Sequence, residues 1–293
     1  MHKLIFYISA PFIWLLSKLP FPILYLISNG LYYLLFYIIG YRKTVVLNNL
    51  KLTFPEKSIS ELKEIRKRFF KHFTDLFIES IKSFSISEKE IKKRYRFKNP
   101  EIINEVAKEG KSIILLGAHY ANWEWITSIP FVLNIDVFAA YTKLENKHFE
   151  KVIKKNRTKY GITGFKTTDF IKYMMTNIKN KKQGLYILLS DQSPQLKKTY
   201  YWKEFFGVKV PIHTGAEMLS KKFDCAVINY SCRKVKRGYY EIEFETITTQ
   251  PNDFEDYQIM DRYLKITEAL IKEEPAHYLW SHKRFKHKDK SPK

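Results

Sequence analysis

Apolar, strand-like runs alternate with helical stretches from residue 112 onward, and this alternation constrains the fold more than any other feature. The strand-like runs are "SIILLGA" (112–118), "DVFAAY" (136–141), "LYILLSD" (185–191), "CAVINYS" (225–231) and "YYEIEFETIT" (239–248). Helical patterns separate or follow them near residues 145–160, 169–180, 214–223 and 253–274. Such alternation predicts an α/β domain with a mostly parallel or mixed sheet flanked by helices.

The N-terminus has a different character, because residues 4–39 carry a single charge, Lys18. The uncharged part from Ile23 to Ile39 would span about 25 Å as a helix, a little less than a hydrocarbon core of roughly 30 Å. Three prolines interrupt the first half: Pro11, Pro20 and Pro22. No small-residue cleavage site follows, so we expect a retained membrane anchor, either one short span or two helices lying partly in the bilayer. The alternative is a buried helical hairpin of a soluble fold.

The charge balance predicts an acidic partner. The formal net charge is +21, which suits nucleic acid, an anionic membrane surface or an acidic protein. Arg42, Lys43 and the basic remainder of the chain place the following domain on the cytoplasmic side. Cys225 and Cys232 form neither a disulfide framework nor a zinc motif, so we expect buried thiols in a reducing compartment.

Helical spacing with many charges fills residues 56–94. An apolar stripe at i, i+4, i+7 and i+8 predicts a face packed on the core: Phe69, Phe73, Leu76 and Phe77. The basic residues of this segment are either a solvated face or a contact with lipid headgroups: Arg66, Lys67, Arg68 and Lys71. We therefore divide the chain into an anchor (1–44), an α/β domain (45–286) whose first part (45–98) is a basic helical lead-in, and a basic tail (287–293). The final "KHKDKSPK" is expected to be disordered.

The stretch "SIILLGAHYANWEW" places an imidazole, His119, and a carboxylate, Glu124, where a buried strand ends. Ligands gather at the carboxyl ends of strands in α/β sheets. If a helix begins near Ala121, the pair can meet only when His119 lies in the turn before it, which Gly117 permits and Asn122 could cap. The carboxylate could then hold one ring nitrogen while the other takes a proton from a hydroxyl. A hydrogen-bonded structural histidine is the alternative.

Five blocks together resemble the bacterial lipid A biosynthesis (late) acyltransferases, within the H-x4-D/E acyltransferase superfamily. His119-x4-Glu124 matches the family's catalytic motif, and four further blocks follow in the family's order: "KKNRTKYG" (154–161), "LLSDQSP" (188–194), "FFGVKVPIHTGAEMLSKKF" (205–223) and "YLWSHKRFK" (278–286). The resemblance implies an acyltransferase-type mixed sheet with an N-terminal membrane-anchoring helical segment. It also implies a bacterial inner-membrane enzyme whose catalytic domain lies on the cytoplasmic face.

The resemblance implies transfer of an acyl chain from acyl carrier protein, or another acyl thioester, to a hydroxyl of a lipid A precursor or related membrane lipid. His119 would be the base and Glu124 its orienter. No covalent acyl-enzyme is expected, and the sequence contains no G-x-S-x-G motif. Backbone N–H groups between Gly117 and Asn122 could bind the oxyanion. A lysophospholipid or aminolipid acyltransferase is the alternative within the enzyme class.

Four other residues are candidates for substrate binding: Asn122, Arg157, Asp191 and Gln192. Arg157 would suit an anionic phosphate group through its fixed donor fork, or it is a surface cation of a basic helix. Asp191 and Gln192 follow a buried strand, where they could orient polar groups near the site or cap a helix. His213 and His282 are expected to be structural, with headgroup contact as a further option for His282.

Two other classes of function find little support in the sequence. His119, Glu124 and His148 could be imagined as a zinc site, but no H-E-x-x-H spacing or cysteine pair supports it. We expect neither a metal nor an organic cofactor. A membrane-tethered nucleic-acid-binding protein would explain the charge, yet the chain carries no recognisable reader motif.

Overall fold

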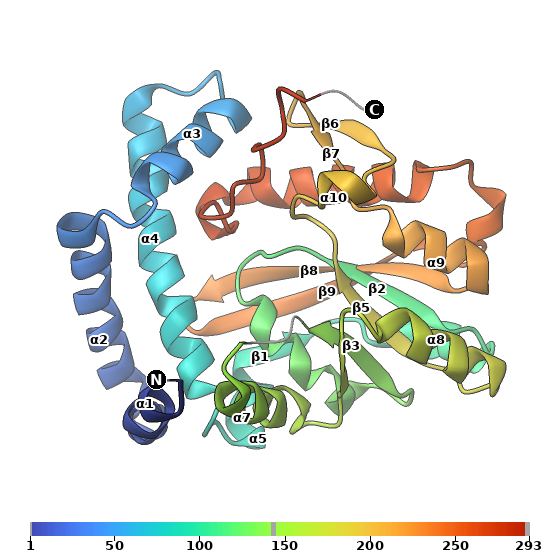
Figure 1. The fold of residues 1–293 in the computed structure, drawn as a ribbon, viewed down its shortest axis with the longest axis horizontal. Coiled ribbons are helices and arrows are strands. Elements are labelled where there is room, and N and C mark those ends of the chain that lie inside the picture. Colours follow the sequence, from blue (N-terminus) through green and yellow to red (C-terminus); the bar gives the residue numbers. More distant parts are fainter. Residues whose placement is uncertain (1, 142–144, 291–293) are drawn as a thin grey trace.

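A seven-stranded mixed sheet forms the centre of the computed structural model, which describes residues 2–141 and 145–290 (Figure 1). The strands are β1 (Tyr95–Phe97), β2 (Ile113–Gly117), β3 (Val137–Tyr141), β4 (Thr163–Lys166), β5 (Leu185–Leu189), β8 (Ala226–Lys236) and β9 (Tyr239–Thr248). Their order is β1-β9-β8-β2-β5-β3-β4, and within this sheet β8 and β9 pair antiparallel while the other neighbours run parallel. The predicted α/β class is confirmed.

Helices and short 3₁₀ turns flank this sheet. They are α5 (Glu88–Arg94), α6 (Glu101–Lys108), η2 (Trp123–Val132), α7 (Lys147–Thr158), α8 (Phe170–Lys179), η3 (Leu196–Lys198), α9 (Gly215–Phe223), η4 (Pro251–Asp253), α10 (Gln258–Glu273) and η5 (Pro275–His277). In Figure 1, α9 and α10 lie above the sheet and α5 and α7 below it. The four predicted helices are thus present as α7, α8, α9 and α10. A separate antiparallel hairpin, β6 (Trp202–Phe205) and β7 (Val208–Pro211), was not predicted.

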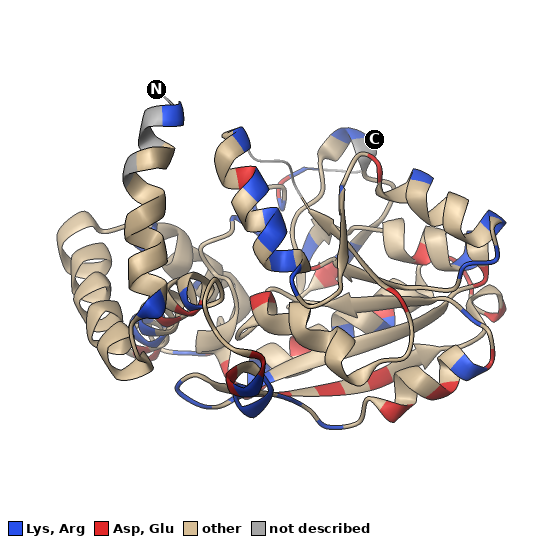
Figure 2. Ribbon diagram, turned by 90° about the horizontal axis from the view of Figure 1, so that it is seen from below, with Lys and Arg blue, Asp and Glu red and all other residues tan. Residues whose placement is uncertain are grey.

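The N-terminal third is helical and stands beside the end of the sheet (Figure 1). It comprises α1 (His2–Lys18), α2 (Phe21–Tyr33), the π-helical η1 (Leu34–Ile39), α3 (Lys43–Thr53) and α4 (Ile59–Lys82). The continuous helix from Phe21 to Ile39 is long and apolar enough to cross a membrane. A stretch of 18 of its residues has a mean hydropathy of 1.6, and 22% of that stretch is buried. Figure 2 shows that α1 and α2 carry almost no charge. The exposure of Leu26 (70%) and Ile38 (78%) argues against the alternative of a fully buried hairpin.

Helix α4 connects the N-terminal helices to the α/β domain. Ser58 and Glu61 form a capping box that fixes where it starts. Phe69 and Leu76 of the predicted stripe are buried, but Phe77 is 54% exposed, which corrects that part of the prediction. Eight helical residues at about 100° each rotate Phe77 roughly 80° away from Phe69, so the stripe drifts off the core-facing side.

The C-terminal segment is more ordered than the sequence predicts. Backbone N–H groups of Lys286, Lys288 and Lys290 donate to carbonyls three residues earlier, so the predicted disorder is wrong for this part of the tail. Buried Phe285 holds the segment against the domain. Residues 291–293 of the tail lie outside the described residues. The prediction of two buried free thiols, Cys225 and Cys232, is confirmed, whereas the boundaries between anchor, domain and tail stay predictions.

Candidate active site

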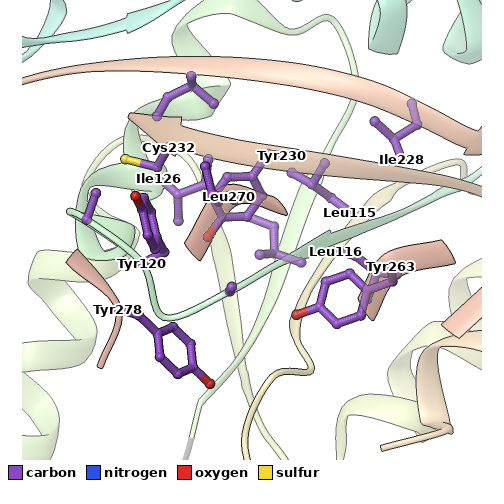
Figure 3. Packing of buried hydrophobic residues seen from close by; sticks show 14 of the residues in the cluster. Leu115, Leu116, Tyr120, Ile126, Ile228, Tyr230, Cys232, Tyr263, Leu270 and Tyr278 are labelled. Atoms are coloured by element: carbon purple, nitrogen blue, oxygen red, sulfur yellow. The ribbon is translucent and has the colours of Figure 1, made fainter. Parts of the chain in front are cut away.

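His119 follows β2, which is buried along its whole length between β5 and β8. The strand ends at Gly117, and the ring of Tyr230 packs directly against this residue. A Cβ atom at position 117 would lie 2.1 Å from Cε1 of Tyr230, so only glycine fits. The Tyr263 hydroxyl donates to the Gly117 carbonyl at 2.7 Å. Figure 3 shows these two tyrosines on either side of the strand that leads to the site.

The loop after β2 is fixed by the C-terminal segment. Ala121 N–H donates to the carbonyl of His277 at 3.0 Å, and Leu279 N–H donates to the carbonyl of His119 at 3.1 Å. Ala121 itself is left-handed, with φ of 49°. The helix predicted to begin near Ala121 therefore begins at Trp123 and is the 3₁₀ helix η2. Leu279 of the block "YLWSHKRFK" and His277 just before it thus hold the loop that carries His119 through their backbone groups.

Asp191 holds the His119 ring. Parallel strands β2 and β5 are neighbours, so the residues that follow them meet at one edge of the sheet. Nδ1 of His119 lies 2.8 Å from Oδ1 of Asp191, whose side chain is only 1% exposed. Among the described residues, Nε2 of His119 has no hydrogen-bond partner, and the His119 side chain is 20% exposed. One ring nitrogen is therefore fixed by a carboxylate while the other is open to a substrate.

The electrostatics of this pair favour a protonatable ring. Burial is the largest influence on the pKa of His119 and lowers it, but the charge and hydrogen bond of Asp191, with the charge of Glu124, outweigh burial and raise the pKa above 6.5. Burial likewise would raise the pKa of Asp191, but the charge and hydrogen bond of His119 lower it below 3.8. Asp191 thus stays ionised and stabilises the imidazolium that a general base becomes.

Glu124 pairs with Arg157 of α7. Their contacts include Nη2 to Oε1 at 2.7 Å and Nη2 to Oε2 at 2.9 Å, with Nε to Oε2 at 3.3 Å. The prediction that the Glu124 carboxylate accepts a hydrogen bond from the His119 ring is therefore wrong, because the planar guanidinium of Arg157 binds both carboxylate oxygens. Glu124 still acts on the ring through its charge. The catalytic roles of both residues stay predictions.

The other candidates differ in what they can offer a substrate. Asn122 is 0% exposed, its Nδ2 donates to Glu79 at 2.7 Å, and its Oδ1 accepts from Trp125 N–H at 3.2 Å. Both polar atoms thus make hydrogen bonds inside the protein. The predicted cap is confirmed, and a role of Asn122 in substrate binding stays a prediction. Gln192 is half-buried beside Asp191 and makes no side-chain hydrogen bond to any described residue, so it is free to bind. Glu79 was not predicted, because nothing in an amphipathic helix marks one carboxylate as buried.

The structure also shows the surroundings of His282 and His213 and the bonds of two backbone N–H groups next to His119. His282 Nε2 accepts from Ser193 N–H at 3.2 Å, and burial lowers its pKa to about 4, so it is a neutral packing residue. Burial also lowers the pKa of His213. In the loop from Gly117 to Asn122, the N–H groups of Tyr120 and Ala121 donate to protein carbonyls, so neither is available to an oxyanion.

Comparison with known proteins identifies the family of the chain. The family model for the bacterial lipid A biosynthesis acyltransferases matches residues 1–287. The chain is similar to the lipid A biosynthesis lauroyltransferase of Escherichia coli (strain K12), with 23% identity over 94% of this chain and 89% of that one. It is also similar to the lipid A biosynthesis palmitoleoyltransferase of the same strain, with 21% identity over 94% of this chain and 88% of that one. The chain therefore belongs to the bacterial lipid A biosynthesis acyltransferase family and is an acyltransferase.

Proposed function

We propose that the protein transfers a fatty acyl chain from acyl carrier protein, or another acyl thioester, to a hydroxyl of a lipid A precursor. The observation that carries this proposal is the His119–Asp191 hydrogen bond of 2.8 Å, with Nε2 of His119 open. Similarity to lauroyl- and palmitoleoyltransferases of lipid A supports the acceptor and a fatty acyl donor. A net charge of +21 suits two acidic partners, acyl carrier protein and a phosphorylated glycolipid.

The reaction needs a base for an alcohol whose own pKa is far above 7. His119 Nε2 takes the hydroxyl proton as the oxygen attacks the thioester carbonyl, and Asp191 stabilises the resulting imidazolium. The new C–O ester bond forms, the C–S bond breaks, and the proton passes from His119 to the leaving thiolate. Arg157 holds Glu124 beside the site, where its negative charge further favours the imidazolium. Gln192, adjacent to Asp191, is free to orient the substrate.

The apolar helix and the charge support a location at the cytoplasmic face of the inner membrane. The helix from Phe21 to Ile39 anchors the chain in a bacterial inner membrane. Arg42 and Lys43 come directly after it, and Lys/Arg residues next to a span favour the cytoplasmic side. The catalytic domain therefore faces the compartment that contains acyl carrier protein.

The decisive experiment is His119→Ala in purified full-length enzyme, assayed with an acyl-carrier-protein donor and a lipid A precursor. A positioned base contributes about 10² to 10⁴-fold, so kcat should fall at least about a hundredfold. His287→Ala serves as the matched control, because that histidine lies in the basic C-terminal tail, where the charges that act on it are those of Lys286 and Lys290. Circular dichroism and thermal unfolding establish that both variants are folded. A folded His119→Ala enzyme within threefold of the parent rate would overturn the proposal.

The acceptor is tested separately in the source bacterium. Deleting the gene and comparing mass spectra of all lipid classes should reveal lipid A species lighter by one acyl chain. If a phospholipid or aminolipid class becomes lighter instead, the enzyme is the lysophospholipid or aminolipid acyltransferase that the sequence left as an alternative.

A further inference from the structure

A cavity of about 510 Å³ opens between α2, α4 and the turn that joins β8 to β9. Three cations line it: Lys71 of α4, Lys234 of β8 and Arg237 of the turn. Asp75 of α4 is the one carboxylate among its lining residues. None of these residues belongs to the site around His119, and the proposed acyl transfer gives them no role.

The cations outnumber the carboxylate. Asp75 is 5% exposed and accepts from Arg237 Nε at 2.9 and 3.0 Å, while Lys234 Nζ lies 3.6 Å from its Oδ2. Lys71 has no acidic partner among the described residues, and its Nζ stands 5.6 Å from the centre of the Tyr32 ring. Glu79 also lies near Lys234, but burial raises its pKa to about 7, so its charge is only partly present at neutral pH. The cavity thus keeps a net positive charge.

One wall of the cavity is the apolar helix. Tyr33, in α2, lines the cavity and is 59% exposed, and Ile38 and Ile39 continue the same helix with 78% and 59% exposure. A group bound here would lie where an apolar surface meets a cluster of cations. The phosphate of a membrane lipid lies at such a boundary. The acyl chains of the lipid are on the apolar side, and the charge of the phosphate is on the polar side.

We propose that this cavity binds a phosphate group carried by a membrane lipid, at a place separate from the acyl-transfer site. Lys71 supplies the free cation. Lys234 and the Nη1 group of Arg237 supply further N–H donors to the phosphate oxygens, while Nε and Nη2 of Arg237 stay bonded to Asp75 and Asn29. The proposal does not rest on which hydroxyl is acylated, nor on His119 as the base.

The cavity is linked to the active-site loop through one buried histidine. Lys234 Nζ lies 3.4 Å from Nδ1 of His72, and Nε2 of His72 lies 3.3 Å from the carbonyl of Ala121. Burial, then the charges of Lys234 and His277, lower the pKa of His72, so its ring is neutral. Its Nε2–H donates to Ala121 and its Nδ1 accepts from Lys234. A phosphate bound here would therefore contact Lys234, which also donates to His72. His72 in turn donates to Ala121, two residues after His119.

Binding is tested by calorimetry on full-length protein in a non-ionic detergent. The ligands are dihexanoyl phosphatidic acid, dihexanoyl phosphatidylcholine and inorganic phosphate. Phosphatidic acid should bind most tightly, and Lys71→Glu should weaken its binding by about tenfold or more, since it removes the free cation. Lys63→Glu is the matched control, because it makes the same charge change at an exposed position of α4 outside the cavity. Thermal unfolding of both variants checks that they are folded.

Three outcomes would overturn the proposal: no binding of phosphatidic acid, equal weakening by Lys63→Glu and Lys71→Glu, or inorganic phosphate binding as tightly as phosphatidic acid. The second means attraction by net charge alone, and the third means a site for free phosphate. The measurement involves no acyl transfer, so its failure is distinct from a failure of the proposed function.

Discussion

At the scale of single residues, the carboxylate on the His119 ring decides the chemistry. Asp191 is hydrogen-bonded to Nδ1 and buried, whereas Glu124 influences the ring only by its charge. A hydrogen-bonded partner fixes the tautomer and orientation of the ring as well as its pKa. We therefore expect the two carboxylates to differ in a pH profile.

Asp191→Asn should move the rising limb of the kcat/KM–pH profile to lower pH. The base acts in its neutral form, and without the Asp191 charge the raised pKa of His119 falls. The plateau should also fall by at least about a hundredfold, because an amide can hold the wrong tautomer. Glu124→Gln should shift the limb in the same direction by less. A larger shift in Glu124→Gln than in Asp191→Asn would contradict this assignment.

Arg157 and Glu124 should act as one unit. Arg157→Lys should lower activity by about tenfold, since an ammonium cannot replace a fork that binds both carboxylate oxygens. The double variant with Glu124→Gln should be no slower than the worse single variant. Lys155→Ala, an exposed change on the same helix, is the control. Additive losses would instead indicate that Arg157 binds an anionic substrate on its own, as the sequence suggested.

At the scale of elements, α4 supports the loop that carries His119 through one buried carboxyl group. Its Glu79 is 0% exposed and accepts hydrogen bonds from Tyr25 of α2 (2.8 Å), Asn122 (2.7 Å) and Tyr240 of β9 (2.8 Å). The Asn122 bond matters most for function, because the same asparagine caps η2, which carries Glu124. One carboxyl group therefore joins α2, the sheet and the loop that carries His119.

Glu79→Gln should change how stability depends on pH. Burial raises the pKa of Glu79 from 4.5 to about 7, so its stabilising contribution is complete below about pH 4.5 and is lost as pH rises through 7. The loss amounts to at most about 3 kcal/mol. The unfolding temperature of the parent relative to Glu79→Gln should be higher at pH 5 than at pH 8. A difference that stays constant over this range would contradict a buried Glu79 with a raised pKa.

At the scale of the whole molecule, helices α1 and α2, which carry almost no charge, adjoin a basic domain (Figure 2). The exposed side chains of the helix from Phe21 to Ile39 would be costly in water and favourable in a bilayer. The net charge of +21 adds attraction to anionic lipid. The two contributions can be separated, because salt screens only the second.

Full-length protein should pellet with membranes and stay there through a wash at about 1 M salt, where the Debye length is roughly 3 Å. Leu26→Glu with Ile38→Glu should release much of it into the supernatant, because these side chains are 70% and 78% exposed on the apolar helix. Tyr200→Glu is the control, at a site 71% exposed that lies outside the N-terminal helices. Complete release of the parent by salt alone would show that charge held it.

Much of the fold follows from local patterns. The runs that became β2, β3, β5 and β8 are largely apolar because the sheet buries most of their residues, and β9 alternates buried and exposed residues. All five are therefore visible in the sequence. The short strands β1, β4, β6 and β7 have four residues or fewer, too few to show a period. Phe77 looked like core because spacing alone does not say how wide a face the neighbouring elements cover.

For the site, the sequence by itself determined that His119 and Asp191 each follow a buried strand. Only the tertiary structure decided that they meet, because strand order places β2 beside β5 although 72 positions separate the two residues. It also decided that Glu124 pairs with Arg157, and that Lys71, Asp75, Lys234 and Arg237 share one cavity. Local sequence fixes which side chains stand at the ends of elements. Which of them become neighbours depends on packing between elements that are distant in the chain.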